Sequence, residues 1–422
     1  MSRMIRLLFV FFFATLPFQF ALSPLSGVDL HISRLFVLGL FGLWLAHSLL
    51  RRSLIIPRAF AAILLASILF LSAFSLFFAE HLSWGIRKLA FLLSFFPLFL
   101  IAFSVFRKTS SREQFAKSLV YGSALSGIIG IAQSFLPFFV GLDPALRFWQ
   151  HIVIPIFSGQ TVSGVVSEYS SMVANVGGTN FFRASAFFPD PHIASFFWGM
   201  TLPFSLALAF QATQQKTKGA QVLFIATTGV IFLADMLTFS RGGYLALIIT
   251  AVVSFSLLFS KLIRKHFLQL GIFGMLFTLV ALVPNPLSNR LLSTFDLSDH
   301  STSGRLAIWS EAIHIIAKHP LTGVGLGNYS NTVLPSAHYR EPRYAHNTLL
   351  DIAAETGIVT ALLFFLAITS TTARALAKRR DNPMLFAGGC SMLIFFVHSL
   401  FETPLYSVHI LPLFLSLIAC IL

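Results

Sequence analysis

Residues 304–320 read GRLAIWSEAIHIIAKHP, and this stretch indicates that the chain is more than a bundle of membrane-spanning helices. Its apolar residues recur at helical spacing, at Leu306, Trp309, Ile313 and Ile316. Ser301 to Ser303 can cap the start of a helix here, and Pro320 ends it. We therefore expect an amphipathic helix lying near a membrane surface, with Arg305 in its first turn.

The sequence around this stretch is mostly apolar. Hydrophobic residues make up 56% of the 422 residues and charged residues only 10%, which is too little charge for the surface of a soluble protein of this length. Apolar runs of about 20 residues recur along the chain, and each is long enough to cross the ~30 Å hydrocarbon core of a bilayer. The fold class predicted is an all-α polytopic membrane protein, with residues 1–422 forming a single transmembrane domain.

The apolar runs predict about twelve transmembrane helices. The first run follows Arg3 and Arg6, as in a signal peptide, but no small-residue cleavage site stands out and more spans follow. It is therefore interpreted as a transmembrane helix. The predicted spans are 5–24, 30–50, 59–79, 84–106, 117–139, 193–212, 220–239, 243–260, 267–284, 347–372, 384–401 and 405–422.

Basic residues fall in alternate connections between these spans. Those near Arg51, Lys216 and Arg374 are basic, whereas the short connections around positions 26, 81 and 403 hold no Lys or Arg. Because basic loops stay in the cytoplasm, both termini are predicted to lie inside, and the net charge of +14 needs no nucleic-acid partner. Two long segments, 141–192 and 285–346, are then extracytoplasmic. The second lies between spans 9 and 10 and carries the amphipathic helix.

The predicted tenth span begins with a polar stripe. Asn347, Asp351 and Glu355 are spaced four residues apart and share one face of a helix. A charged group within the membrane costs about 2.5–3.5 kcal/mol or more and normally faces a polar interior. The stripe therefore predicts a cavity open to the outside.

Arg241 lies in a very short connection, residues 238–244, which reads TFSRGGY. The two glycines leave room beside the Arg241 and Ser240 side chains. One interpretation is a structural pair between Arg241 and Asp235. The other is an arginine directed at phosphate, because a guanidinium stays charged and binds phosphate oxygens in pairs. Arg305 is the second candidate for such a role.

His346 stands where the second long segment meets the predicted tenth span. A histidine here can be a cap or an interface residue. It can also be the general base that takes a proton from a hydroxyl acceptor, since imidazole titrates near neutral pH. The extracytoplasmic histidines and acids lack the spacing of a metal site, so we expect no metal and no cofactor.

Arg183 belongs to the aromatic stretch FFRASAFFPDPH at residues 181–192. The aromatic residues suit the headgroup zone of a membrane. Arg183 and His192 could face a polar lipid head, or Arg183 could be an interfacial anchor that reaches toward water. Both interpretations stay open.

The chain resembles the O-antigen ligase and O-antigen polymerase superfamily of bacterial inner-membrane proteins, and most of all the ligases. Five stretches carry the resemblance, in the same order and with similar spacing. They are TFSRGGYLAL at 238–247, GRLAIW at 304–309, KHPLTGVGLGN at 318–328, AHNTLLD at 345–351 and ETG at 355–357.

The resemblance implies metal-independent glycosyl transfer at the periplasmic face of the inner membrane. The donor would be a glycan on undecaprenyl diphosphate, and the acceptor a sugar hydroxyl of lipid A-core or another glycan. The two phosphate-binding arginines of the family fall on Arg241 and Arg305 and its essential histidine on His346. An upstream family arginine is similar to Arg183. Further residues expected to support the site are Ser240, Arg343, Asn347, Asp351 and Glu355.

Other activities remain open. Chain polymerases and protein O-oligosaccharyltransferases share these motifs, and no motif separates them from ligases. A transporter or flippase of lipid-linked sugars is the alternative from another class. It predicts paired broken helices, an inverted repeat and mid-membrane charges, whereas this sequence shows no such repeat and gathers its charges at the outer face.

Overall fold

A computed structural model describes residues 2–25, 27–52, 54–168, 171–258, 290, 300–336, 343–378 and 382–422. Within these ranges the chain is predominantly α-helical. Two small antiparallel hairpins accompany the helices. One pairs β1 (Ala21–Leu25) with β2 (Val28–His31), and the other pairs β3 (Val173–Val176) with β4 (Thr179–Phe182).

Eight helical stretches of the described chain are long and apolar enough to cross a membrane, so the predicted class of polytopic helical membrane protein is confirmed. The predicted count of twelve is not. The eight are α2 (Ile32–Leu50), α3 with η1 (Phe60–Phe78), α4 with α5 (Leu82–Phe106), α6 with α7 (Thr109–Val140), α11 (Pro191–Gln214), α12 (Lys218–Met236), α13 (Arg241–Leu258) and α19 (Ile358–Ala377). Two shorter apolar helices follow, α20 (Pro383–His398) and α21 (Ile410–Ile421).

One predicted span differs at the N-terminal end, and another falls where the structure is not described. The helix predicted over 5–24 is α1 (Arg3–Thr15), which Ser2 caps through its side chain. The chain then turns and forms β1, so the later part of the apolar run is strand. The predicted span 267–284 lies outside the described residues.

The prediction of one continuous helix over 347–372 is wrong. The chain forms α18 (Thr348–Thr356), breaks at Gly357, and continues as α19. Gly357 has φ 89°, a left-handed conformation that glycine adopts without steric penalty. A Cβ at this position would lie 2.1 Å from the carbonyl oxygen of Leu321. The break lets α18 turn away from the line of the membrane helix.

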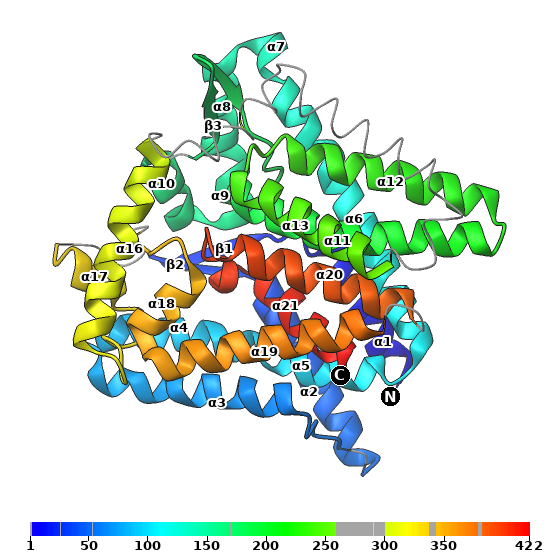
Figure 1. Cartoon of the computed structure of the whole chain (residues 1–422), viewed down its shortest axis with the longest axis horizontal. Coiled ribbons are helices and arrows are strands. Elements are labelled where there is room, and N and C mark those ends of the chain that lie inside the picture. Colours follow the sequence, from blue (N-terminus) through cyan, green and yellow to red (C-terminus); the bar gives the residue numbers. More distant parts are fainter. Residues whose placement is uncertain are drawn as a thin grey trace.

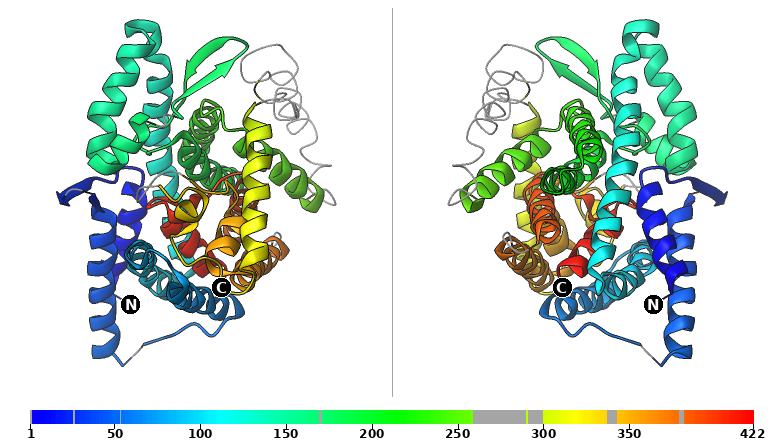
Figure 2. Two further views of the ribbon diagram at one scale, coloured as in Figure 1. Left: turned by 90° about the vertical axis from the view of Figure 1, so that its left-hand side faces the viewer. Right: turned by 90° about the vertical axis from the view of Figure 1, so that its right-hand side faces the viewer.

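The predicted amphipathic helix is α16 (His300–Lys318). It begins earlier than expected, so Arg305 lies beyond its first turn, and it ends just before Pro320. Figure 1 shows α16 upright at the left, crossing the direction of α12, α13, α19 and α20. In the left view of Figure 2 it passes in front of the ends of these helices. Helix α16 therefore lies across one end of the bundle, as a surface helix would, while both termini lie toward the other end.

Helix α11 is the most buried of the long helices and packs mainly against α12, α20 and α6. Aromatic side chains such as Phe196, Phe197 and Trp198 are fully buried along it. Its N-terminus, capped by Asp190, emerges at the end of the bundle that α16 crosses.

The segment predicted as the first extracytoplasmic connection, 141–192, holds short elements. They are α8 (Leu142–Phe148), a π-helical turn (Trp149–Val153), α9 (Ile154–Ser158), α10 (Gln160–Glu168) and the second hairpin. After α16 the chain forms α17 (Tyr329–Val333).

Candidate functional site

Arg241 and Arg305 line the same pocket, although 64 positions separate their numbers in the sequence. Arg241 is the first residue of α13, and Arg305 lies on α16. The pocket is partly open to solvent, and its empty space, with the adjoining solvent included, is about 660 Å³. Its other lining residues are Gly242 and Leu245 of α13, Leu306 and Trp309 of α16, and Phe401. Two cations from separate helices thus face a cavity whose walls are otherwise largely apolar.

Glu402 connects Arg305 to His346. One carboxylate oxygen, Oε1, accepts from Arg305 Nη2 at 2.9 Å, and the other, Oε2, lies 2.8 Å from His346 Nδ1. Glu402 is only 8% exposed. The sequence analysis missed this residue, although it is the single charged residue of the short connection between α20 and α21. That isolation is the signal that could have identified it.

His346 itself has an unusual backbone conformation. Its φ is 48°, in the left-handed region that non-glycine residues adopt rarely and at some energetic cost. The structure around it fixes this conformation. Burial alone would lower the pKa of His346, but the hydrogen bond to Glu402 and the charge of Glu402 raise it above its ordinary value. The same contact, together with the charges of His192 and Arg305, holds the pKa of Glu402 below its ordinary value despite burial.

Asp351 and Asn347 build the loops that carry these groups. Asp351 accepts from the backbone N–H of Ala345 at 2.7 Å and from the Thr403 hydroxyl. It therefore joins the residue before His346 to the residue after Glu402. Asn347 caps α18 by accepting from Leu349 and Leu350. The oxygens of both side chains are used in backbone and loop contacts, and an open cavity beside them stays a prediction.

Thr348 strengthens the same junction. Its backbone N–H donates to the Ser399 carbonyl at 2.8 Å, and its hydroxyl donates to the Glu402 carbonyl at 3.0 Å. The start of α18 is thus bonded directly to the connection between α20 and α21, which explains how residues 56 positions apart, His346 and Glu402, keep a fixed geometry.

Glu355, the third residue of the predicted polar stripe, binds a lysine of another helix. Both of its oxygens bind the ammonium group of Lys88 on α4, at 2.8 and 2.6 Å. Lys88 in turn lies 3.7 Å from the ring centroid of Tyr406. This carboxylate of the predicted polar stripe is therefore used in an ion pair with α4.

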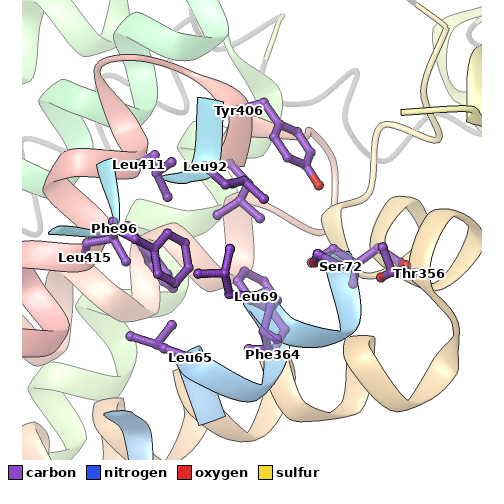
Figure 3. Close-up of a pocket in the computed structure, with 14 residues that line it drawn as sticks. Leu65, Leu69, Ser72, Leu92, Phe96, Thr356, Phe364, Tyr406, Leu411 and Leu415 are labelled. Carbon is purple, nitrogen blue, oxygen red and sulfur yellow. Dashed lines mark hydrogen bonds between the residues drawn. The ribbon is translucent and has the colours of Figure 1, made fainter. Parts of the chain in front are cut away.

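A second pocket lies beside this ion pair and is apolar (Figure 3). Side chains of α3, α4, α19 and α21 point into it, among them Leu69, Leu92 and Phe96, and Tyr406 stands at its edge. Its empty space, with the adjoining solvent included, is about 460 Å³, and none of the predicted catalytic or phosphate-binding residues lines it.

A chain of polar contacts continues from Glu402 into the bundle. His192 Nε2 lies 3.7 Å from Glu402 Oε1, and His192 Nδ1 lies 3.1 Å from the Ser240 hydroxyl. The same hydroxyl lies 3.1 Å from His398 Nε2. Ser240, predicted as a supporting residue, is buried between two histidines, and neither contact was evident from the sequence.

Arg183 is buried and holds the connection that leads to Arg241. It donates to the carbonyls of Thr238 at 2.6 Å and Ser171 at 2.8 Å, and it lies 3.3 Å from His192 Nε2. The interfacial-anchor interpretation is wrong, because the side chain is inside the protein with only 4% of the residue exposed. Its guanidinium positions the backbone just before Ser240.

The remaining predictions near the site have separate outcomes. Asp235 accepts from Ser195 at 2.6 Å, and its second oxygen has no partner among the described residues, so a structural pair with Arg241 is not observed there. Arg343 is exposed and does not line the pocket. Position 340, another basic residue of the segment, lies outside the described residues. No cluster of three metal-ligating side chains occurs in the described ranges.

Residues 226–365 match the family model described as O-antigen ligase. This range contains Arg241, Arg305 and His346, and it confirms the resemblance to the O-antigen ligase superfamily. No match was found among curated proteins.

Proposed function

Since residues 226–365 match the O-antigen ligase family model, we propose that this chain transfers a glycan from undecaprenyl diphosphate to a sugar hydroxyl of lipid A-core. The observation that carries this proposal is the shared pocket. Arg241 and Arg305 line it together, and Glu402 connects Arg305 to His346. Dispersed motifs of the sequence thus meet at one end of the bundle.

The two arginines suit the diphosphate of the donor. A charged hydrogen bond contributes about 1.5–3 kcal/mol, and the contribution is larger where water is excluded. Arg241 is 7% exposed and the Arg305 side chain 23% exposed, so both are substantially desolvated. As the bond between the anomeric carbon and the phosphate oxygen breaks, its electron pair stays on the diphosphate, and the two guanidinium groups stabilise the charge that develops.

His346 suits the acceptor side of the reaction. With its Nδ1 proton directed at Glu402, the Nε2 atom is the acceptor of the neutral ring. It takes the proton of the attacking sugar hydroxyl while that oxygen forms the new bond to the anomeric carbon. The products are the glycosylated acceptor and the lipid diphosphate, and the proton on His346 is then released. Such a base contributes roughly 10²–10⁴-fold to the rate.

Two further features support a lipid-linked donor at the periplasmic face. Leu245, Leu306 and Phe401 give the pocket an apolar wall that fits isoprene units near the diphosphate. Both termini and the turn between α11 and α12, which is basic in sequence, lie at the end of the bundle away from α16 (Figure 1). This arrangement agrees with basic loops in the cytoplasm and α16 in the periplasm.

The test is a reconstituted reaction. Detergent-purified protein is incubated with an undecaprenyl-diphosphate-linked glycan and one of three acceptors: lipid A-core, a second lipid-linked glycan, or an acceptor protein. A covalent product with lipid A-core, formed without ATP, metal or an ion gradient, supports the ligase. Product with only the second or third acceptor indicates a polymerase or a protein O-oligosaccharyltransferase instead. Translocated lipid without any covalent product indicates a flippase and refutes the proposal.

A further inference from the structure

The two carboxylate oxygens of Glu402 contact different parts of the proposed site, one on the donor side and one on the acceptor side. Oε1 binds Arg305, which belongs to the donor pocket, and Oε2 binds His346, the proposed base. The carboxylate is buried, so neither oxygen can exchange its partner for bulk water without rearrangement. An anion that occupies a phosphate-binding arginine in the absence of donor must compete with the donor for that arginine.

We propose that Glu402 is a positioning residue that holds Arg305 until the lipid diphosphate arrives, and that donor binding then shifts the carboxylate toward His346. This inference rests on the proposed function, because it assigns the donor diphosphate to Arg305. The inference also gives the reaction an order. His346 reaches its full proton affinity only after the lipid diphosphate donor has bound.

The geometry makes this exchange possible without breaking the site. Glu402 uses only Nη2 of Arg305, and a guanidinium carries five N–H donors, so a diphosphate can bind Arg305 from the pocket side. The negative charge of the diphosphate then repels Oε1. Displaced from Arg305, the carboxylate keeps its contact with His346 through Oε2.

Titratable or charged groups from several neighbouring elements act on the Glu402 carboxylate. Helix α16 presents a cation to the carboxylate, α11 presents a histidine, and the segment before α18 presents the base. The titratable and charged groups that act on Glu402 or share its two basic partners are Arg305, His192, His346, Arg183, Tyr344, Asp351 and His398. Arg305 and His346 contact different oxygens of the carboxylate, so the loss of the Arg305 contact leaves the His346 contact in place.

The first experiment measures binding alone, with farnesyl diphosphate as a short lipid diphosphate and no acceptor. Glu402→Gln removes the competing charge and is expected to bind the probe more tightly, by roughly 5- to 150-fold, the usual range for coupling between two sites. Arg305→Gln is expected to bind it more weakly. Glu80→Gln is the matched control, because Glu80 accepts from Asn331 at 2.8 Å, outside the donor pocket, and its change leaves probe affinity unaltered.

The second experiment measures transfer by the same variants. Glu402→Gln is expected to lower kcat while lowering KM for the donor, and to move the acidic limb of the pH profile to lower pH, since the Glu402 charge no longer raises the pKa of His346. Glu402→Asp keeps the charge on a shorter side chain. It should bind the probe within about twofold of wild type and still lose turnover, because it spans both partners poorly.

Unchanged or weaker probe binding in Glu402→Gln overturns the inference. If the Glu402→Gln protein does not fold, the Glu402→Asp variant provides the test. Equal losses of probe binding and turnover in Glu402→Asp also overturn the inference. The binding result does not require transfer activity. A protein that binds the probe as expected but forms no glycan product therefore refutes the proposed function and leaves the competition between Glu402 and the diphosphate standing.

Discussion

Two buried glutamates, Glu355 on α18 and Glu402 in the connection between α20 and α21, bind basic partners in different ways. Glu355 gives both oxygens to a single ammonium group, that of Lys88, beside an apolar pocket. Glu402 gives one oxygen to Arg305 and the other to His346, beside a pocket lined by two arginines. The first arrangement is closed and holds helices together. The second leaves the other N–H groups of Arg305 and the Nε2 atom of His346 outside the contact, so burial and charge alone do not separate a structural pair from a functional one.

The sharpest test of the functional side is His346→Ala. If His346 is the base, transfer falls by roughly 10²–10⁴-fold while the protein still inserts in the membrane and accumulates. The measurement is product formation per mole of folded protein, with size-exclusion profiles as the folding control. Normal product from this variant defeats the assignment of the base.

Lys88→Met tests the structural side. It leaves the buried Glu355 carboxylate without its counter-charge, and breaking a buried ion pair in this way costs about 3–5 kcal/mol. Thermal unfolding in detergent should show the loss. The double variant Lys88→Met with Glu355→Gln should recover part of it, since the remaining group is then neutral. Full stability in the single variant would mean that the pair does not hold α4 to α18.

Arg241→Ala and Arg305→Ala probe the donor pocket. Each should reduce kcat/KM for the donor by roughly 10- to 100-fold, the equivalent of one charged hydrogen bond. Lys should substitute poorly at both positions, because an ammonium group cannot bind two phosphate oxygens in a planar pair. Arg343→Ala is the control, since that exposed side chain does not line the pocket. Full activity with Lys would refute paired recognition of the phosphate.

The pH dependence of transfer should reflect the Glu402 contact. The pKa of His346 is raised above 6.5, because the bond and the charge of Glu402 outweigh the effect of burial. A histidine base acts in its neutral form. Activity is therefore full at pH values above this raised pKa and is lost as the pH falls through it. We expect the acidic limb of log kcat/KM to have its midpoint above pH 6.5. A midpoint below that value would contradict this description of the site.

The smallest effect is expected for Asn347→Ala. This change removes the side-chain cap of α18, which costs about 0.5–2 kcal/mol. Asn382 caps α20 with the same two-bond geometry, so Asn382→Ala is a matched control for stability. Only Asn347→Ala should also lower turnover, because Asn347 follows His346 directly. Equal turnover in the two variants would show that capping of α18 does not position the histidine.

The class of fold and the three principal candidate residues were predictable from the sequence. Long apolar runs identify membrane helices by length alone, and a helix over 304–320 follows from local periodicity and Pro320. The break at Gly357 was missed, since hydropathy continues across it. The stretch ETG before a new apolar run is nevertheless typical of a helix C-terminus, where glycine adopts a left-handed conformation.

The contacts of Glu402 could not be predicted in the same way. Its partners lie 56 and 97 positions away in the sequence, and neither spacing nor composition encodes such pairs. The same limitation applies to Asp351, which shares a helical face with Glu355 but binds Ala345 and Thr403 instead. Side-chain partners across a fold depend on how helices pack, which is a property of the whole chain.

By itself, the sequence determined that this protein is a helical membrane protein and that arginine and histidine carry its candidate chemistry. These are local properties: a run of apolar residues favours the bilayer wherever it stands, and a guanidinium stays charged in any loop. Only the tertiary structure decided which charges meet. The pairing of Arg305 with His346 through Glu402, and of Glu355 with Lys88, follows from the way α18 leaves α19, packs against α16 and meets α4 at Lys88. Buried charges require partners at bonding distance, and only the packed fold provides that distance.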